Sequence, residues 1–248
     1  VVKRHSNEAH EAAPDSVLST RGITIAAGHR ILVQDIGFEL KRGETLGILG
    51  ESGSGKTLTS LSLLGLLPPG LHTTSGSAVV AGEHIDLSDE KRLAALRGRT
   101  MGMIFQEPMA ALDPCFTIGH HLAEVLLAHG VPSGQVQSKV IELLDQVKIA
   151  HPAEVASRYP HQISGGMAQR VGIARALAIE PQILLADEPT TALDVTVQAE
   201  ILSLLRQLSR SRQMAVVLVT HDWGVVADIC DRALVLRHGR VLESARVE

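Results

Sequence analysis

Three glycines, a lysine and a threonine recur at fixed spacing within eight consecutive residues. The segment Gly50-Glu51-Ser52-Gly53-Ser54-Gly55-Lys56-Thr57 matches the pattern G-x-x-x-x-G-K-[ST] at every specified position, and Leu58 continues it into an apolar run. Glycine permits backbone conformations that a β carbon forbids, so successive N–H groups can surround a phosphate. We therefore expect a loop that binds ATP, with Lys56 reaching the β and γ phosphates and Thr57 offering Mg²⁺ a hydroxyl.

Two adjacent acids follow a short apolar run further along the chain. Ile183-Leu184-Leu185-Ala186 leads directly into Asp187-Glu188. This places both carboxylates at the carboxyl end of a strand, where open α/β sheets bind ligands. Successive strand residues face opposite ways, so the two acids are expected to do different work. We assign Asp187 to the Mg²⁺ shell and Glu188 to the attacking water as the general base.

The segments around these residues alternate between strand and helix patterns. A short buried strand is expected at 45–49 before the glycine-rich loop, and an apolar helix at 56–67 after it, ending before Pro68. Later strands are expected at 183–186 and 215–220, and helices at 165–179 and 195–209. Strands that alternate with helices predict an α/β fold with a parallel, two-sided sheet.

Other patterns flank this predicted core. Residues 1–16 are polar and without periodicity, which predicts an N-terminal tail. Short apolar alternations broken by glycine at 17–40 predict an antiparallel β-subdomain, and 233–243 predicts a closing hairpin. Helical apolar spacing at 118–129 and 135–147 predicts a helical insertion.

Composition excludes several classes of function. The 248 residues are 45% hydrophobic, and 23 Lys+Arg against 27 Asp+Glu give a formal net charge of -4. No broad basic field is available for nucleic-acid phosphates, so we expect no nucleic-acid partner. Apolar runs such as 215–219 are much shorter than the roughly 18 residues of a spanning helix, so the chain is not expected to cross a membrane by itself.

A second glycine-rich segment narrows the assignment. Ile163-Ser164-Gly165-Gly166-Met167-Ala168-Gln169-Arg170 resembles the ABC signature L-S-G-G-x-x-Q-R, with Ile163 as its single departure. The resemblance covers 17–248 and implies an ABC ATPase domain: a P-loop NTPase (RecA-like) core, an antiparallel β-subdomain and an ABC-type α-helical subdomain at about 107–170. It also implies that Ser164, Gly165 and Gly166 grip the γ phosphate bound to the opposite subunit.

The other motifs of the ABC family occur in the family's order. Gln106 follows an expected strand at 101–105, Asp194 follows Glu188, and His221 follows the strand at 215–220. By resemblance, Gln106 touches Mg²⁺ or the lytic water and links the site to the membrane subunits. Asp194 would lie across the dimer interface, and His221 would hold the γ phosphate.

Three longer segments resemble the peptide/nickel importer branch: FQEPMAALDP at 105–114, YPHQ at 159–162 and DEPTTALD at 187–194. Members of this branch are peripheral ATPases at the cytoplasmic face of the cell membrane. The resemblance therefore implies two permease subunits, a second ABC ATPase subunit and, indirectly, an extracytoplasmic solute-binding protein as partners. It implies transport coupled to MgATP hydrolysis, with peptide and nickel both open as cargo and the ATPase dimer either homo- or heteromeric.

Two features depart from that family. The stretch 26–30 lacks the aromatic residue on which adenine usually stacks, leaving His29 or Arg30 as possible substitutes. The cysteine-bearing extension of many peptide-branch members is also absent, so we expect no iron–sulfur cluster. Both departures favour a shorter nickel-type subunit, but a trimmed chain or half of a fused protein would show them equally.

Two alternatives belong to other classes. A soluble ABC ATPase of DNA repair or translation usually carries a coiled-coil insertion, a tandem ATPase domain or basic linkers, and this sequence shows none of them. A non-hydrolysing, nucleotide-gated binding module is disfavoured by the presence of Glu188 and His221 together.

Overall fold

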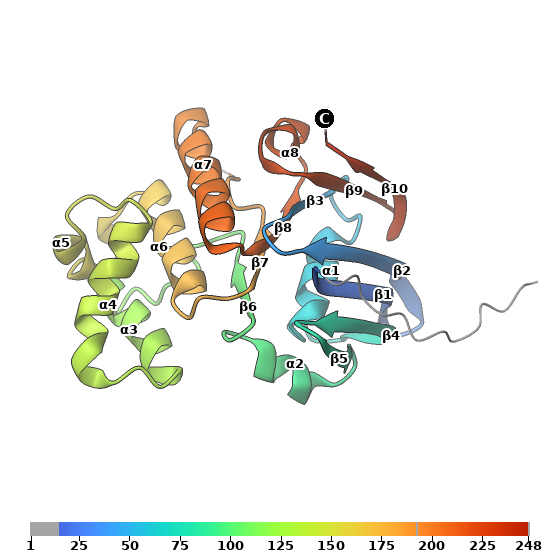
Figure 1. Ribbon diagram of the computed structural model, residues 1–248, viewed down its shortest axis with the longest axis horizontal. Helices are drawn as coiled ribbons and strands as arrows, with labels where there is room; N and C mark the ends of the chain where they lie inside the picture. Colours follow the sequence, from blue (N-terminus) through green and yellow to red (C-terminus); the bar gives the residue numbers. More distant parts are fainter. Residues whose placement is uncertain (1–14, 192, 248) are drawn as a thin grey trace, which may run out of the picture.

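Two β-sheets and a group of helices make up the computed structural model, which describes residues 15–191 and 193–247. The helical group lies at one end of the molecule and the antiparallel sheet at the other, with the second sheet between them (Figure 1). The arrangement confirms the predicted α/β class, because a mainly parallel sheet forms the centre.

The four-stranded sheet is antiparallel throughout. Its spatial order is β2-β1-β4-β5, which confirms the β-subdomain predicted from the glycine-broken alternation. Ser16, placed in the predicted tail, is instead the first residue of a strand, and residues 1–14 lie outside the described residues. The strands are β1 (Ser16–Ala27), β2 (Arg30–Lys41), β4 (Leu71–Val80) and β5 (Glu83–Asp86).

The six-stranded sheet has the order β10-β9-β3-β8-β7-β6, and every neighbouring pair except β10 with β9 is parallel. Strands β3, β7 and β8 are buried at every position, as expected of strands covered on both faces. The carboxyl ends of β3, β6, β7 and β8 consequently meet along one edge. The strands are β3 (Thr45–Leu49), β6 (Met101–Ile104), β7 (Ile183–Asp187), β8 (Ala215–Thr220), β9 (Arg232–Arg237) and β10 (Arg240–Arg246).

The helices divide between the sheets and the helical group. Helices α3, α4 and α5 pack on one another, and α3 and α4 also pack on α6, sharing one apolar core with the helices beside the parallel sheet. The predicted subdomain boundary at residue 170 falls inside α6. The helices are α1 (Lys56–Leu63), α2 (Glu90–Leu96), α3 (Ile118–Ala128), α4 (Ser133–Gln146), α5 (Pro152–Ala156), η1 (Pro160–Gln162), α6 (Gly165–Leu177), α7 (Val195–Arg212) and α8 (Trp223–Ile229).

Helix α1 is shorter than its apolar pattern predicts. The prediction carried it to residue 67, but it ends at Leu63. Gly65 adopts a left-handed φ of 61°, and its N–H and that of Leu66 donate back to the carbonyls of Ser62 (3.2 Å) and Leu61 (3.0 Å). This glycine closure satisfies the last carbonyls of the helix, so the chain leaves it before the prolines are reached.

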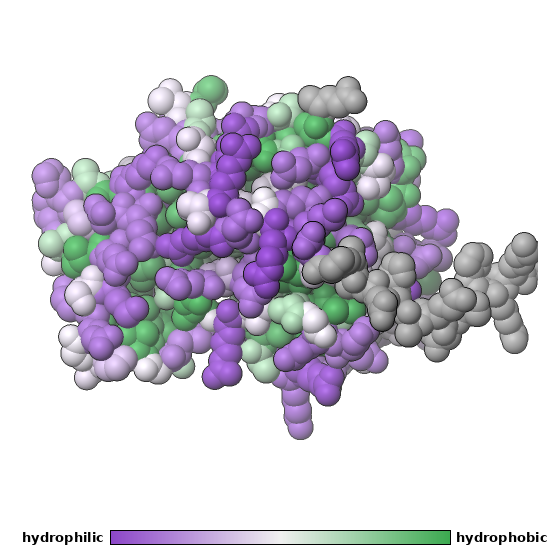
Figure 2. All heavy atoms as spheres, viewed as in Figure 1, coloured by the Kyte–Doolittle hydropathy of each residue, from purple (hydrophilic) through white to green (hydrophobic). Residues whose placement is uncertain are grey.

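The surface is largely polar on the face shown in Figure 2, where apolar residues form scattered patches. Among the described residues, no helix combines the length and the apolar character needed to span a bilayer.

Candidate active site

Each of the four parallel strand ends delivers one of the predicted site residues. Gly50 follows β3, Glu188 follows β7 and His221 follows β8, each by one residue, and Gln106 lies two residues beyond β6. In the ladders Leu49 lies opposite Thr220, and Asp187 opposite Val219. The register therefore brings residues from four distant parts of the sequence to one edge of the sheet.

The loop 50–57 is shaped by its glycines. Gly50 has a φ of 153°, and a β carbon there would collide with the carbonyl oxygen of Leu236 and lie 2.5 Å from Ser54 Oγ. Helix α1 begins at Lys56 with no side chain capping its first amides. Uncapped amides at a helix N-terminus, together with the helix dipole, favour an anion such as phosphate.

The Lys56 ammonium lies inside the loop. Only 6% of the residue is exposed, and its Nζ donates to the carbonyl oxygens of Gly50 (2.8 Å) and Glu51 (2.9 Å). Burial lowers the pKa of Lys56, while Glu188 and Asp187 act in the opposite direction. A buried cation of this kind is stabilised by an incoming anion, so Lys56 fits a triphosphate.

Thr57 and Asp187 form the second pair. The Thr57 hydroxyl donates to Asp187 Oδ1 at 3.0 Å, and Asp187 is 3% exposed. Burial raises the pKa of Asp187, and the Thr57 hydrogen bond opposes that rise. Within the described chain no three His, Cys, Asp or Glu side chains gather as a metal site. A hydroxyl and one carboxylate are instead the kind of partial oxygen shell that Mg²⁺ completes with phosphate and water.

Glu188 is the centre of a hydrogen-bonded cluster. Its Oε2 accepts from Gln106 Nε2 (3.2 Å) and from the Thr191 hydroxyl (2.8 Å), while its Oε1 lies 3.3 Å from His221 Nδ1. The Glu188 side chain is 16% exposed and that of His221 60%. The structure thus brings Glu188, Gln106 and His221 together, as the sequence predicts of residues that share one site.

From the sequence, Asp187 and Glu188 were expected to point in opposite directions as successive residues of one strand, but Glu188 is not part of the strand. Strand β7 ends at Asp187, and Glu188 adopts a left-handed φ of 45° while its N–H still donates to Val219 O at 2.9 Å. The two acids diverge because the backbone turns after Asp187. Strand alternation alone does not separate them. A positive φ in a non-glycine residue is uncommon, and here it turns the backbone so that the Glu188 side chain leaves the direction of the strand.

Thr191 was missed by the sequence analysis. Its N–H also donates to the Glu188 carbonyl at 3.2 Å, so it holds both the backbone and the side chain of that acid. Its spacing of three residues from Glu188 is that of a hydrogen-bonded turn, and this is the signal that could have identified it.

The predicted signature residues lie elsewhere. Ser164 caps α6 by accepting from Met167 N (3.3 Å), and Asp194 caps α7 by accepting from Thr196 N and Val197 N. Across the part of the chain that the structure describes, no hydrogen bond joins Ser164, Gly165 or Asp194 to the loop 50–57. These residues do not complete the phosphate site within one chain.

The remaining predicted residues occupy ordinary positions. Leu58 packs against the apolar core of the β-sheets. Glu51 and Ser52 are exposed on the loop, and His29 and Arg30 are exposed at the turn between β1 and β2.

A comparison with protein families identifies the chain: the ABC transporter model matches residues 33–191. The chain belongs to the ABC transporter family. This membership confirms the family predicted from the signature segment and the order of the surrounding motifs.

Curated relatives carry names from peptide import. The glutathione import ATP-binding protein GsiA of Salmonella typhimurium (strain LT2) is 46% identical over 94% of this chain and 39% of its own length. The oligopeptide transport ATP-binding protein OppD of Lactococcus lactis subsp. cremoris (strain SK11) is 44% identical over 90% of this chain and 67% of its own length. The dipeptide transport ATP-binding protein DppD of Bacillus subtilis (strain 168) is 45% identical over 91% of this chain and 66% of its own length. The chain thus spans about two fifths to two thirds of these relatives.

Solved structures agree with the fold. The ATP-binding cassette MJ0796, dimeric and bound to ADP and Pi, is 29% identical with a TM-score of 0.80, covering 93% of this chain and 99% of that one. The cbiO1 component of the cbiONQ ABC transporter complex from Clostridium perfringens is 27% identical with a TM-score of 0.81, covering 94% and 89%. The ABC ATPase fold expected from the sequence is confirmed.

Proposed function

We propose that this chain is the ATP-binding and ATP-hydrolysing subunit of an ABC import system, which couples MgATP-driven closure of an ATPase dimer to transport through partner permeases. The observation that carries the proposal is the Glu188 cluster: a carboxylate held by Gln106, Thr191 and His221 beside Lys56 and the Thr57–Asp187 pair. This arrangement places a general base beside a loop built for a triphosphate.

In this proposal the residues of the chain divide the work. Lys56 and the amides at the start of α1 bind the phosphates, and Thr57 with Asp187 holds Mg²⁺. Magnesium, when bound, neutralises charge on the β and γ phosphates. Glu188 Oε1 or Oε2 takes a proton from the attacking water, and Gln106 and Thr191 fix the orientation of that carboxylate. His221, exposed beside it, holds the γ phosphate.

A second ATPase subunit completes the site. Ser164 and Gly165 are exposed at the start of α6 and Gly166 beside them is half-buried, and a β carbon built on Gly165 meets no atom within 4 Å. The open side of this turn is suited to close approach by a phosphate held on another subunit. Asp194, exposed at the start of α7, would face the same interface. The two subunits would be identical or different chains.

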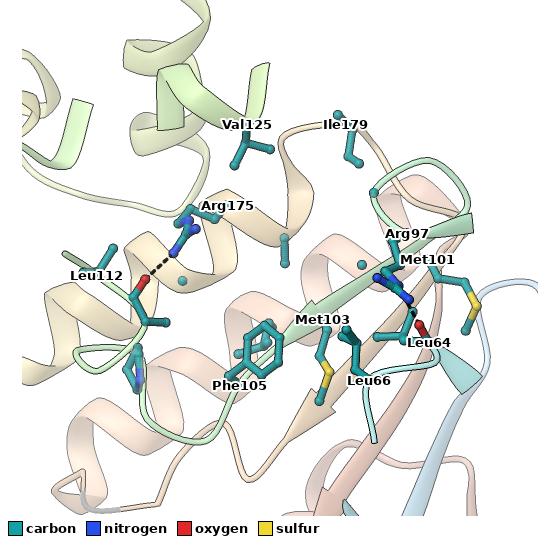
Figure 3. Close-up of a pocket in the computed structure, with 17 residues that line it drawn as sticks. Leu64, Leu66, Arg97, Met101, Met103, Phe105, Leu112, Val125, Arg175 and Ile179 are labelled. Atoms are coloured by element: carbon teal, nitrogen blue, oxygen red, sulfur yellow. Dashed lines mark hydrogen bonds between the residues drawn. The ribbon is translucent and has the colours of Figure 1, made fainter. Parts of the chain in front are cut away.

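A groove beside Gln106 is the proposed contact with a permease. It lies between α6 and β6, and it is lined by the exposed Phe105 and the half-buried Met103 and Leu66 (Figure 3). Arg175 and Arg97 also line it, and none of its lining residues is acidic. Phe105 immediately precedes Gln106, so a partner seated in this groove would lie one residue from a side chain that holds the base.

The relatives favour peptides as the cargo, and nickel is the other candidate. Cargo would be selected by the permease and by an extracytoplasmic solute-binding protein, which this subunit would serve indirectly. The chain would act as a peripheral protein at the cytoplasmic face of the cell membrane.

The proposal is tested with Glu188→Gln. The amide keeps the shape of the side chain but cannot accept the proton from water, so the rate of ATP hydrolysis should fall by about 10²- to 10⁴-fold while ATP affinity is retained. ATP-bound dimers should then accumulate, measured by size-exclusion chromatography with and without MgATP.

Glu180→Gln is the matched control. Glu180 is exposed and also has a positive φ (53°), but it lies outside the site, so its rate should equal that of the unchanged protein. Unaltered hydrolysis in Glu188→Gln, or an unchanged protein without any ATPase activity in the presence of its permease, would contradict the proposal.

A further inference from the structure

Two contacts, one helical turn apart, join the start of α6 to the start of α7. A β carbon built on Gly166 would lie only 2.8 Å from Val197 Cγ1, so the side chain of Val197 fills the space above this glycine. One turn further, Arg170 Nη2 pairs with Glu200 Oε2 at 2.6 Å. Arg170 is 11% exposed at its side chain and its Nη1 also donates to Val147 O at 2.8 Å, which fixes the guanidinium from two sides.

The two neighbouring glycines of the signature segment therefore have different surroundings. A β carbon on Gly165 meets nothing within 4 Å, whereas the same atom on Gly166 would collide with Val197. Packing within this chain explains why residue 166 is a glycine. A β carbon there would lie 2.8 Å from Val197 Cγ1, which is closer than β carbons approach other atoms in real structures. Gly165 alone faces open space.

The start of α7 is also tied to Glu188. The Thr191 hydroxyl donates to the Glu188 carboxylate, and Asp194 Oδ1 accepts from the backbone N–H of Val197 at 3.0 Å. The same residue whose side chain covers Gly166 thus has its backbone held by the loop that follows Glu188. The general base and the signature turn of the same subunit are thus linked by these contacts and by the short chain segment that leads from Thr191 to Asp194.

We propose that Val197 and Glu200 are positioning residues that fix the signature turn relative to Glu188 of the same subunit. The inference rests on the proposed function, in which that turn contacts the nucleotide of the partner. A nucleotide on the partner then orders the Ser164–Gly166 turn, the turn constrains α7, and α7 constrains the base of the other site. On this basis, the contacts of Val197 and Glu200 between α6 and α7 are the part of this chain that transmits the coupling between the two sites.

The experiment measures ATP hydrolysis against ATP concentration for Glu200→Ala, using the full chain with its partners. The Hill coefficient should fall from about 2 in the unchanged protein toward 1, and ATP affinity in the isolated subunit should stay the same. Asp228→Ala is the matched control. It removes the Arg206–Asp228 pair between α7 and α8 (3.2 Å), and Asp228 is 55% exposed against 58% for Glu200. Its Hill coefficient should not change.

A second variant pair tests the packing contact. Gly166→Ala should lower the hydrolysis rate by roughly tenfold, because the added methyl group pushes α6 away from α7. Val197→Ala in the same chain vacates that space, and the double variant should return to within about threefold of the unchanged rate.

Three results would overturn the inference: a Hill coefficient of 1 in the unchanged protein, an equal fall in Asp228→Ala and Glu200→Ala, or a double variant no faster than Gly166→Ala. Each leaves the proposed function intact provided that the unchanged protein hydrolyses ATP. Absence of hydrolysis altogether would instead refute the proposed function.

Discussion

The phosphate pocket and the signature turn are both glycine-rich helix starts, but they are built differently. In the phosphate pocket Lys56 and Asp187 are buried and each is hydrogen-bonded to another part of the same site. In the signature turn Ser164 and Gly165 are exposed, and the Ser164 side chain caps its own helix by accepting a hydrogen bond from Met167 N.

In the proposed function, this difference separates the half of the site that one chain completes from the half that needs a second subunit. Buried charges require partners, and the pocket supplies them from the loop that follows β3 and from helix α1. The signature turn presents backbone and the Ser164 hydroxyl to open space, and in the proposed function its ligand is the nucleotide of a second subunit. Variants of the phosphate pocket are therefore expected to lose ATP affinity in the isolated subunit, and variants of the signature turn to lose hydrolysis while keeping that affinity.

The largest effect is expected from Lys56→Ala. Loss of the buried ammonium removes charge-assisted bonds to the β and γ phosphates, so ATP affinity of the isolated subunit should fall by about 100-fold. Equilibrium binding of a fluorescent ATP analogue measures this. Lys139→Ala, at an exposed lysine on α4, should bind normally. Equal affinities in both variants would remove the distinction between the two regions.

A mixture of two inactive variants gives an intermediate effect. Gly165→Glu should abolish hydrolysis without weakening ATP binding to the isolated subunit, because it blocks only the exposed turn. Mixed with Lys56→Ala, it should recover activity up to roughly a quarter of that of the unchanged protein, a limit reached if the one intact site works independently of its neighbour. About half of randomly paired dimers are mixed, and each mixed dimer keeps one intact site of two. A mixture as inactive as its components would show that the two elements do not meet across a dimer.

The smallest effect is on stability. Burial raises the pKa of Asp187, so the folded chain binds this proton more tightly than the unfolded chain does. The stabilisation from that proton is present at acidic pH and is lost as the pH rises through the raised pKa. Asp187→Asn removes the buried charge and should raise the melting temperature of the nucleotide-free protein by a few degrees at pH 7, with a gain that shrinks as the pH is lowered.

Asp145→Asn, at an exposed residue of α4, is the control for this measurement and should leave the melting temperature unchanged. Gly165→Ala should also leave it unchanged, because its added methyl group meets no neighbour. A lower melting temperature for Asp187→Asn at pH 7 would show that Thr57 and Lys56 outweigh the cost of burying the carboxylate, and would contradict the raised pKa of Asp187.

The sequence by itself determined the α/β class, the phosphate loop and the candidate base. A short apolar run predicts a buried strand, and the residues directly after it, the glycine-rich loop at 50–57 or the acids Asp187-Glu188, indicate phosphate or metal chemistry. Both patterns lie within a few consecutive residues, so they can be identified without the tertiary structure. Gln106 and His221 were assigned to the same site only because they follow the expected strands in the order of the ABC family's motifs. The end of α1 was missed because its apolar pattern continues past Gly65, whose left-handed closure depends on backbone hydrogen bonds.

Only the tertiary structure decided how these pieces meet. The register of β7 against β8 brings His221 to Glu188, and the left-handed turn at Glu188 directs its carboxylate to Gln106 and Thr191. Packing against Val197 gives Gly166 different surroundings from those of Gly165. Each of these depends on the relative position of segments far apart in the chain or on a single backbone angle. Residue type and spacing do not encode such distances, because they arise from the packing of the whole core.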